Sequence, residues 1–133
     1  MAKLGNRRDR GFTLIELMIV ISMILILVSI SIPAYNQSIL RAKESVLKQD
    51  LFTLRNVIDQ YTLDKQKAPQ ALDDIVQAGY IKQVPKDPFT NEANWTLDQE
   101  DAANAVDQQE PGITDVHSSS NLTATDGTAY SSW

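Results

Sequence analysis

An apolar run near the N-terminus constrains the fold more than any other feature of this sequence. The 21 residues from Phe12 to Ile32 are Leu, Ile, Val, Met and one Phe, interrupted only by Thr13, Glu16 and three serines. A helix of this length is about 30 Å long, which matches the hydrocarbon core of one bilayer. The run is too long for a secretory signal peptide, and no small-residue cleavage pattern follows it. We therefore predict a membrane-spanning helix.

Charge is distributed unevenly on the two sides of this run. Four of the 12 basic residues precede it, opposed by Asp9 alone, whereas the whole chain has a net charge of -5. Because basic residues stay on the cytoplasmic side of a first spanning helix, we expect a cytoplasmic N-terminus and an outer C-terminal head. The acidic head argues against a nucleic-acid partner, and the absence of cysteine excludes disulfides.

Glu16 is costly inside an apolar segment. One interpretation is that its carboxylate reaches the headgroups and has no role. The other is that Glu16 meets a positive partner, and the next basic residue along the chain is Arg41. Cleavage after Gly11 would create such a partner, the free amine of Phe12, which lies one helical turn from Glu16 or can reach Glu16 of a neighbouring copy. This pairing would fix the axial register between copies.

The segment Gly11-Phe12-Thr13-Leu14-Ile15-Glu16 resembles the processing site of type IV prepilins and type II secretion pseudopilins. The resemblance implies that residues 1–11 form a leader, which prepilin peptidase removes by cleavage between Gly11 and Phe12. It also implies that Phe12 is then N-methylated, and that Glu16 guides docking of the subunit into a filament.

Pro33 either ends the first helix near Ser31 or kinks a helix that continues. Residues 34–65 contain no Gly or Pro, and their apolar side chains recur at helical spacing, which favours continuation. In the resembling family this proline belongs to a helix that can melt locally during assembly. The predicted apolar stripe consists of Leu40, Leu47, Leu51, Leu54, Ile58 and Tyr61. Two charge pairs at i, i+4 spacing, Glu44–Lys48 and Arg55–Asp59, predict a solvated opposite face.

The C-terminal part predicts a small head. Pro69 ends the long helix, and a short helix is expected over Gln70–Ala78 with Gly79 at its C-terminal end. Pro85 and Pro88 predict a rigid extended loop. Strands are expected over 94–97 and 113–118. The tail from Ser119 is polar enough for disorder, but its two late aromatic residues suggest that it is held in place.

These elements predict an α+β fold: a long N-terminal helix with a small head made of a short helix, a Pro-rich loop and a minimal antiparallel sheet. The predicted organisation is a cleaved leader over 1–11, a transmembrane and assembly helix over 12–33, an amphipathic helix over 34–66 and the head over 67–133.

The stretch Tyr80-Ile81-Lys82-Gln83-Val84-Pro85-Lys86-Asp87-Pro88-Phe89 resembles a loop of the major pseudopilin class; an ordinary Pro-rich loop is the alternative. In that class the C-terminal loop binds calcium. The resemblance implies a Ca²⁺ site from the Ser118 and Asp126 side chains and from carbonyls at Leu122 and Thr128. This sequence has one Asp where the family commonly has more. His117 is the only histidine, and without Cys or further His ligands it does not predict a zinc site.

Nothing in the sequence predicts an enzyme, since it has no phosphate-binding loop, nucleophile elbow or paired metal ligands. The resemblance instead implies a structural subunit of a type II secretion pseudopilus that drives protein export. It implies no required cofactor, and the Ca²⁺ named above is an optional ligand. Its implied partners are identical subunits, minor pseudopilins, prepilin peptidase, an inner-membrane platform with its ATPase, and lipid before assembly. A surface type IV pilin for adhesion, twitching motility or DNA uptake is the alternative, followed by a membrane-tethered periplasmic binding module.

Overall fold

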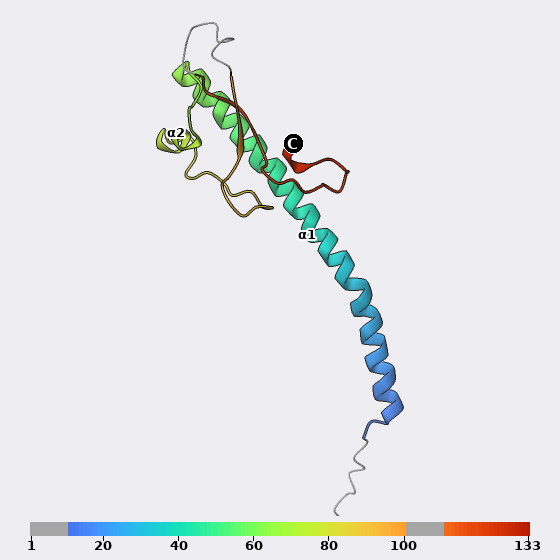
Figure 1. Ribbon diagram of the computed structural model, residues 1–133. Helices are drawn as coiled ribbons and strands as arrows, with labels where there is room; N and C mark the ends of the chain where they lie inside the picture. Colours follow the sequence, from blue (N-terminus) through green and yellow to red (C-terminus); the bar gives the residue numbers. More distant parts are fainter. Residues whose placement is uncertain (1–10, 101–110) are drawn as a thin grey trace, which may run out of the picture. The chain divides into compact units, whose positions relative to one another are not determined.

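The computed structural model describes residues 11–100 and 111–133. Its helices are α1 (Leu14–Lys65), α2 (Leu72–Gln77) and a single 3₁₀ turn (Tyr130–Ser132), and its strands are β1 (Thr96–Gln99) and β2 (Ile113–His117) (Figure 1). This confirms the predicted α+β class. The chain divides into two compact units between Ser38 and Ile39, and each is described here by itself.

Helix α1 continues through Pro33, so the interpretation of a continuing helix is correct. Thr13 precedes its first residue, and Lys65 in its last turn complements the helix dipole. The chain leaves the helix at Gln66, whose φ of 55° lies in the left-handed region, and Pro69 follows three residues later. The sequence contains both the start and the stop signals of this helix.

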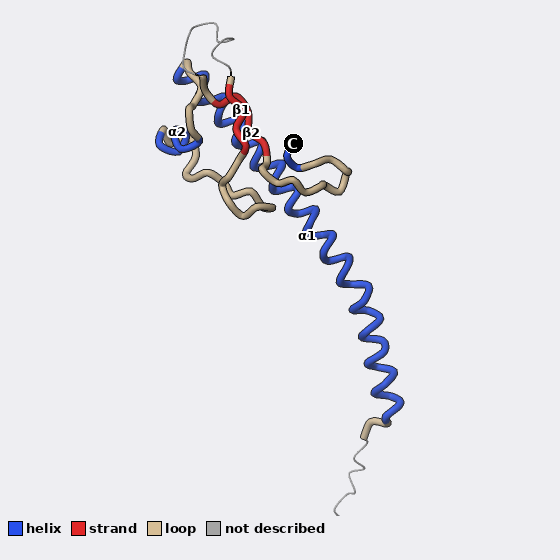
Figure 2. Tube along the Cα trace, in the orientation of Figure 1, coloured by secondary structure: helices blue, strands red, loops and turns tan. Residues whose placement is uncertain are grey.

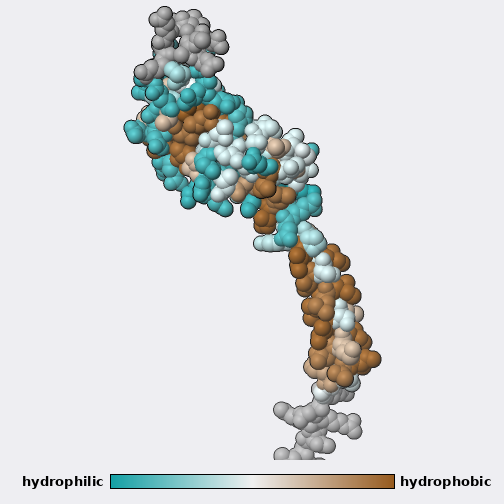
Figure 3. Space-filling model, in the orientation of Figure 1, coloured by the Kyte–Doolittle hydropathy of each residue, from teal (hydrophilic) through white to brown (hydrophobic). Residues whose placement is uncertain are grey.

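The first unit carries an apolar surface over α1. Side chains from Leu14 to Ile32 are exposed, and this helix is long and apolar enough to cross a membrane (Figure 3, brown). Its serines do not interrupt that surface with unpaired hydroxyls. Ser22 Oγ donates to the carbonyl of Met18 at 2.7 Å, and Ser31 Oγ donates to that of Leu27 at 2.8 Å. Such bonds satisfy the hydroxyls within their own helix.

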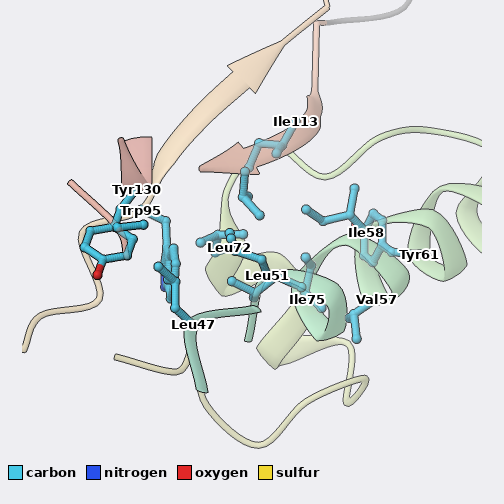
Figure 4. Close-up of a cluster of buried hydrophobic side chains, with 13 residues drawn as sticks. Leu47, Leu51, Val57, Ile58, Tyr61, Leu72, Ile75, Trp95, Ile113 and Tyr130 are labelled. Atoms are coloured by element: carbon cyan, nitrogen blue, oxygen red, sulfur yellow. The ribbon is translucent and has the colours of Figure 1, made fainter. Parts of the chain in front are cut away.

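The second unit has one hydrophobic core, built on the later part of α1. Leu47, Leu54 and Ile58 are fully buried or nearly so, which confirms most of the predicted stripe, whereas Leu40 is only partly buried. Figure 4 shows side chains of α1 facing others from α2 and β2. The residues packed against the stripe include Leu72, Ile75, Trp95, Ile113, Val116 and Tyr130.

The two predicted charge pairs on α1 are wrong. Glu44 is buried and accepts hydrogen bonds from the C-terminal segment rather than facing Lys48. Arg55 pairs with Asp115 of β2 at 2.6 Å rather than with Asp59. The i, i+4 spacing allows such pairs, but an acceptor or donor from a distant segment offers a less hydrated and better-oriented partner.

The short helix and the sheet lie close to their predicted positions. Helix α2 is shorter than expected, and Gly79 follows it with a φ of 84°, which a glycine adopts without strain. Strands β1 and β2 pair antiparallel, with Leu97 opposite Val116 and Asp98 opposite Asp115 (Figure 2, red). A bulge follows between Asp98 and Gln99.

Both strand predictions need correction: the first strand lies two residues later, at Thr96–Gln99 instead of 94–97, and the second is one residue shorter. The first strand begins at Thr96 rather than at Asn94, because the buried Trp95 is held against the Pro-rich loop by an Nε1–H bond to the Pro85 carbonyl at 2.8 Å. The second strand ends at His117 rather than at Ser118, because the Ser118 hydroxyl donates to buried Asp87. In both cases a side-chain contact ends the ladder.

Candidate processing and assembly site

The predicted cleavage site lies in an open part of the chain. Gly11 and Phe12 precede the first helical residue, and the Phe12 side chain is 84% exposed. The space around the Gly11 Cα is empty within 4 Å of where a Cβ would stand. The remaining leader residues, 1–10, lie outside the described part of the chain. Steric access to the bond between Gly11 and Phe12 is therefore compatible with the predicted processing.

Glu16 belongs to the first turn of α1. The backbone N–H of Glu16 donates to Oγ1 of Thr13 at 3.2 Å, so Thr13 caps the helix. A carboxylate in this turn also faces the positive end of the helix dipole. The Thr-x-x-Glu spacing from Thr13 to Glu16 is an N-terminal capping signal, and it was the one local signal that could have located this helix start in the sequence. Glu16 thus sits at a helix start, where its charge costs less than at mid-helix.

The surroundings of Glu16 are apolar. Leu17 to Leu40 contains no charged residue, so Glu16 is isolated along this face of the helix. A shallow groove on the same unit is lined by Leu14, Ile15, Met18, Ile19, Ser22, Met23 and Ile26. A helix with this surface needs lipid or other helices around it.

In the head, hydrogen bonds to Glu44 hold the C-terminal segment against α1. Its carboxylate accepts bonds from the Thr125 N–H and hydroxyl, both at 2.8 Å, and from the Tyr130 hydroxyl at 2.8 Å. Burial raises the pKa of Glu44, but these three bonds outweigh burial and hold the pKa below its ordinary value. Burial, together with the bond to Glu44, raises the pKa of Tyr130 to about 12. The tail is therefore held in place, as its aromatic residues suggested.

The Pro-rich loop is held by a second buried carboxylate. Asp87 is fully buried, accepts the Phe89 N–H at 2.8 Å and accepts the hydroxyl of Ser118. The Phe89 ring stacks on Tyr130 with centroids 3.9 Å apart. The loop and the C-terminal segment therefore form one packed structure.

A third polar connection joins α1, β2 and the last residue. Arg55 Nε donates to Asp115 Oδ1 at 2.6 Å, and Arg55 Nη2 donates to the carbonyl oxygens of Val116 and Trp133, both at 2.9 Å. Burial raises the pKa of Asp115, but hydrogen bonds from Arg55 and the Val116 N–H hold it below its ordinary range. His117 is a half-buried strand residue, as predicted, with Nδ1 2.6 Å from the Trp133 oxygen.

All four predicted calcium donors are engaged within the chain. Ser118 bonds to Asp87, and Asp126 Oδ1 accepts the Thr128 N–H and hydroxyl at 2.9 and 2.6 Å. The Leu122 carbonyl accepts the Tyr130 N–H, and the Thr128 carbonyl accepts the Ala124 N–H. Ca²⁺ needs six to eight oxygens, so binding here would require these groups to serve the ion in addition to their present partners. The calcium site stays a prediction.

Comparison with known proteins gives a family model and several relatives that match this chain. A family model described as the prokaryotic N-terminal methylation motif matches residues 6–32, which include Gly11, Phe12 and Glu16. The type II secretion system core protein G of Aeromonas hydrophila is 35% identical over 102 residues, covering 65% of this chain and 71% of the relative. The protein of the same name from Escherichia coli K12 is 34% identical, covering 64% and 70%.

The likeness extends beyond these two relatives. The Vibrio cholerae core protein G is 33% identical over 104 residues, covering 67% of this chain and 71% of the relative. No solved structure gives a significant match. A methylation motif and relatives of this identity and coverage confirm the family that the residues around Gly11 and Pro85 predicted. The chain belongs to the family of type II secretion system core protein G, the major pseudopilins.

Proposed function

We propose that this chain is a prepilin that is cleaved between Gly11 and Phe12, methylated at Phe12, and polymerised through its N-terminal helix into a type II secretion pseudopilus. The observation that carries the proposal is a single carboxylate, Glu16, one turn from Phe12 on a helix whose surface from Leu14 to Ile32 is otherwise apolar. The methylation motif and the core protein G relatives support the same role. That role is structural rather than catalytic.

The proposed mechanism follows from the cost of an unpaired charge. The precursor lies in the inner membrane with a cytoplasmic N-terminus and a periplasmic head. After cleavage, the amine of Phe12 and the carboxylate of Glu16 on a neighbouring copy neutralise each other in apolar surroundings. The apolar face of α1 exchanges lipid for identical helices. The partners are other copies, minor pseudopilins, prepilin peptidase, and the membrane platform with its ATPase.

Glu16→Ala and Glu16→Gln, expressed with the secretion components of the native host, test this mechanism. We expect both variants to be inserted and cleaved normally but to yield far fewer filaments, measured by sedimentation of sheared filaments and immunoblotting. Ser22→Ala is the matched control, since it removes a polar group from the same apolar segment of α1 without removing charge. Wild-type filament yield from both Glu16 variants would refute the pairing.

The intact mass of the chain extracted from host membranes tests processing separately. A chain that begins at methylated Phe12 is expected, whereas one that still begins at Met1 would favour a membrane-tethered binding module. Deletion of the gene should abolish export of secreted proteins. Loss of twitching or DNA uptake with intact export would instead favour the surface pilin. Calcium binding by Ser118, Leu122, Asp126 and Thr128 is a separate proposal, tested by Ca²⁺-dependent thermal stability in Asp126→Asn.

A further inference from the structure

One face of the paired strands β1 and β2 brings together two carboxylates and the imidazole of His117. Asp98 on β1 lies directly opposite Asp115 on β2, and His117 follows Asp115 by two residues on the same strand. Alternation along a strand places Asp115 and His117 on one face. Like charges directly opposite each other destabilise a sheet, so a cation beside Asp98 and Asp115 would stabilise this pair. Arg55 Nε bonds Oδ1 of Asp115 and balances one of the two negative charges, so the carboxylate pair keeps one net negative charge for a nearby cation to balance.

The geometry fixes which nitrogen of His117 faces the carboxylates. Nδ1 lies 2.6 Å from the main-chain oxygen of Trp133, an atom that can only accept, so Nδ1 carries a proton. Arg55 holds the same oxygen through Nη2 at 2.9 Å. Nε2 then lies 2.9 Å from Asp98 Oδ2 and 3.6 Å from Asp115 Oδ2. In the neutral ring this nitrogen presents a lone pair toward two anionic oxygens, an arrangement that a bound cation satisfies.

We propose that Asp98 Oδ2, Asp115 Oδ2 and His117 Nε2 bind one divalent transition-metal ion, with zinc as the best fit. The three ligand atoms lie within 4.8 Å of one another. Three protein ligands with a water in the fourth position make a tetrahedral zinc site. Metal-bound histidines almost always donate their other N–H to a carbonyl or carboxylate, which is what Nδ1 does here. A nitrogen ligand disfavours calcium and magnesium, so this site is distinct from the predicted calcium donors.

The ion would connect three separate segments of the head. It would bridge β1 to β2 directly and would reach the C-terminal residue through the bond from His117 to Trp133. Because the ion binds the folded head and not the unfolded chain, it raises the stability of the head. This inference does not depend on the proposed role of Glu16, and it can fail or succeed without it.

Zinc titration of the full chain in detergent micelles, purified without a polyhistidine tag and stripped with a chelator, tests the site. Against a competing chromogenic chelator we expect one Zn²⁺ per chain, and we expect Asp98→Asn and His117→Gln each to weaken binding by at least about tenfold. Asp59→Asn is the matched control because it removes an exposed carboxylate of α1 outside the cluster, and it should leave the affinity unchanged. Equal affinity in wild type and His117→Gln would overturn the proposal.

A second measurement needs no variant. Because His117 is the only histidine, the imidazole ¹⁵N signals of the wild-type chain belong to it alone. Adding ZnCl₂ should shift the Nε2 resonance while Nδ1 stays protonated, and lowering the pH should release the ion as protons compete for the ring. An Nε2 signal that does not change with saturating zinc would show that the cluster is only an ion pair between His117 and Asp98.

Discussion

The hydroxyl of Tyr130 donates to Oε1 of Glu44 at 2.8 Å, a bond between residues 86 positions apart. Glu44 is a charged residue on a helix face that is otherwise apolar, and Tyr130 is only 1% exposed. This contact, with the two bonds from Thr125, sets where the C-terminal segment crosses α1. Substitution of Glu44 removes all three of these bonds at once, so their contribution to stability can be measured.

Replacing Glu44 with alanine should lower the free energy of unfolding of the head by about 2–4 kcal/mol, because the buried Tyr130 hydroxyl and two donors of Thr125 lose a charged acceptor. Urea unfolding in detergent micelles, followed by tryptophan fluorescence, measures this change. Glu92→Ala, at an exposed position, should stay within about 0.5 kcal/mol of wild type. A Glu44→Ala head as stable as that control would mean that the contact contributes nothing.

Acid should destabilise the head partly through Glu44. The pKa of Glu44 is depressed in the folded state, so its contribution to stability is present above the free-glutamate value of about 4.3 and is lost as pH falls through the lower folded pKa. Between about pH 5 and 3, wild type should therefore lose more stability than Glu44→Gln, which does not titrate. Parallel pH profiles of melting temperature for the two proteins would contradict this.

The bond from Ser118 to Asp87 connects the Pro-rich loop to the end of β2 inside the core. Asp87→Ala should cost about 2–4 kcal/mol of unfolding free energy, since the Ser118 hydroxyl and the Phe89 N–H lose their acceptor. Ser118→Ala should cost less. The double variant should be less destabilised than the sum of the two single changes, because the residues interact directly. Strict additivity would show that they do not.

Gly112 passes close to the end of the long helix. A Cβ at this position would lie 2.5 Å from the Ala68 Cβ and 2.8 Å from the Ala68 carbonyl oxygen. Gly112→Ala should therefore cost about 1–3 kcal/mol through overpacking. Adding Ala68→Gly should restore only part of the loss, since the backbone atoms of Ala68 remain. Full restoration would place the clash at the side chain alone, and an unchanged melting point for Gly112→Ala would refute the close approach.

The sequence predicted the elements that depend on local signals. The apolar period of α1, the stop at Pro69 and the glycine after α2 act within a few residues, and the structure has them all. The motif from Gly11 to Glu16 is equally local, and the methylation family model covers it.

Predictions from the sequence are wrong for side chains whose hydrogen-bond partner lies far along the chain. The i, i+4 spacing predicts partners four residues away for Glu44 and Arg55, but their partners Thr125 and Asp115 are 81 and 60 positions away. The cluster around His117 was missed for the same reason, since Asp98 comes from the opposite strand. A single histidine predicts no metal site until pairing of β1 with β2 supplies the carboxylates.

The serines of the first unit satisfy their hydroxyls on carbonyls of their own helix, as Ser22 does with Met18 and Ser31 with Leu27. Because these hydroxyls are already bonded within the helix, moving this surface from lipid to a bundle of similar helices would break no hydrogen bond. Apolar contacts with lipid or with similar helices differ little in energy when the helix shifts along its axis. Glu16 is the one charged residue from Leu14 to Leu40, so in the proposed assembly it is the group that would give the helix a preferred axial position.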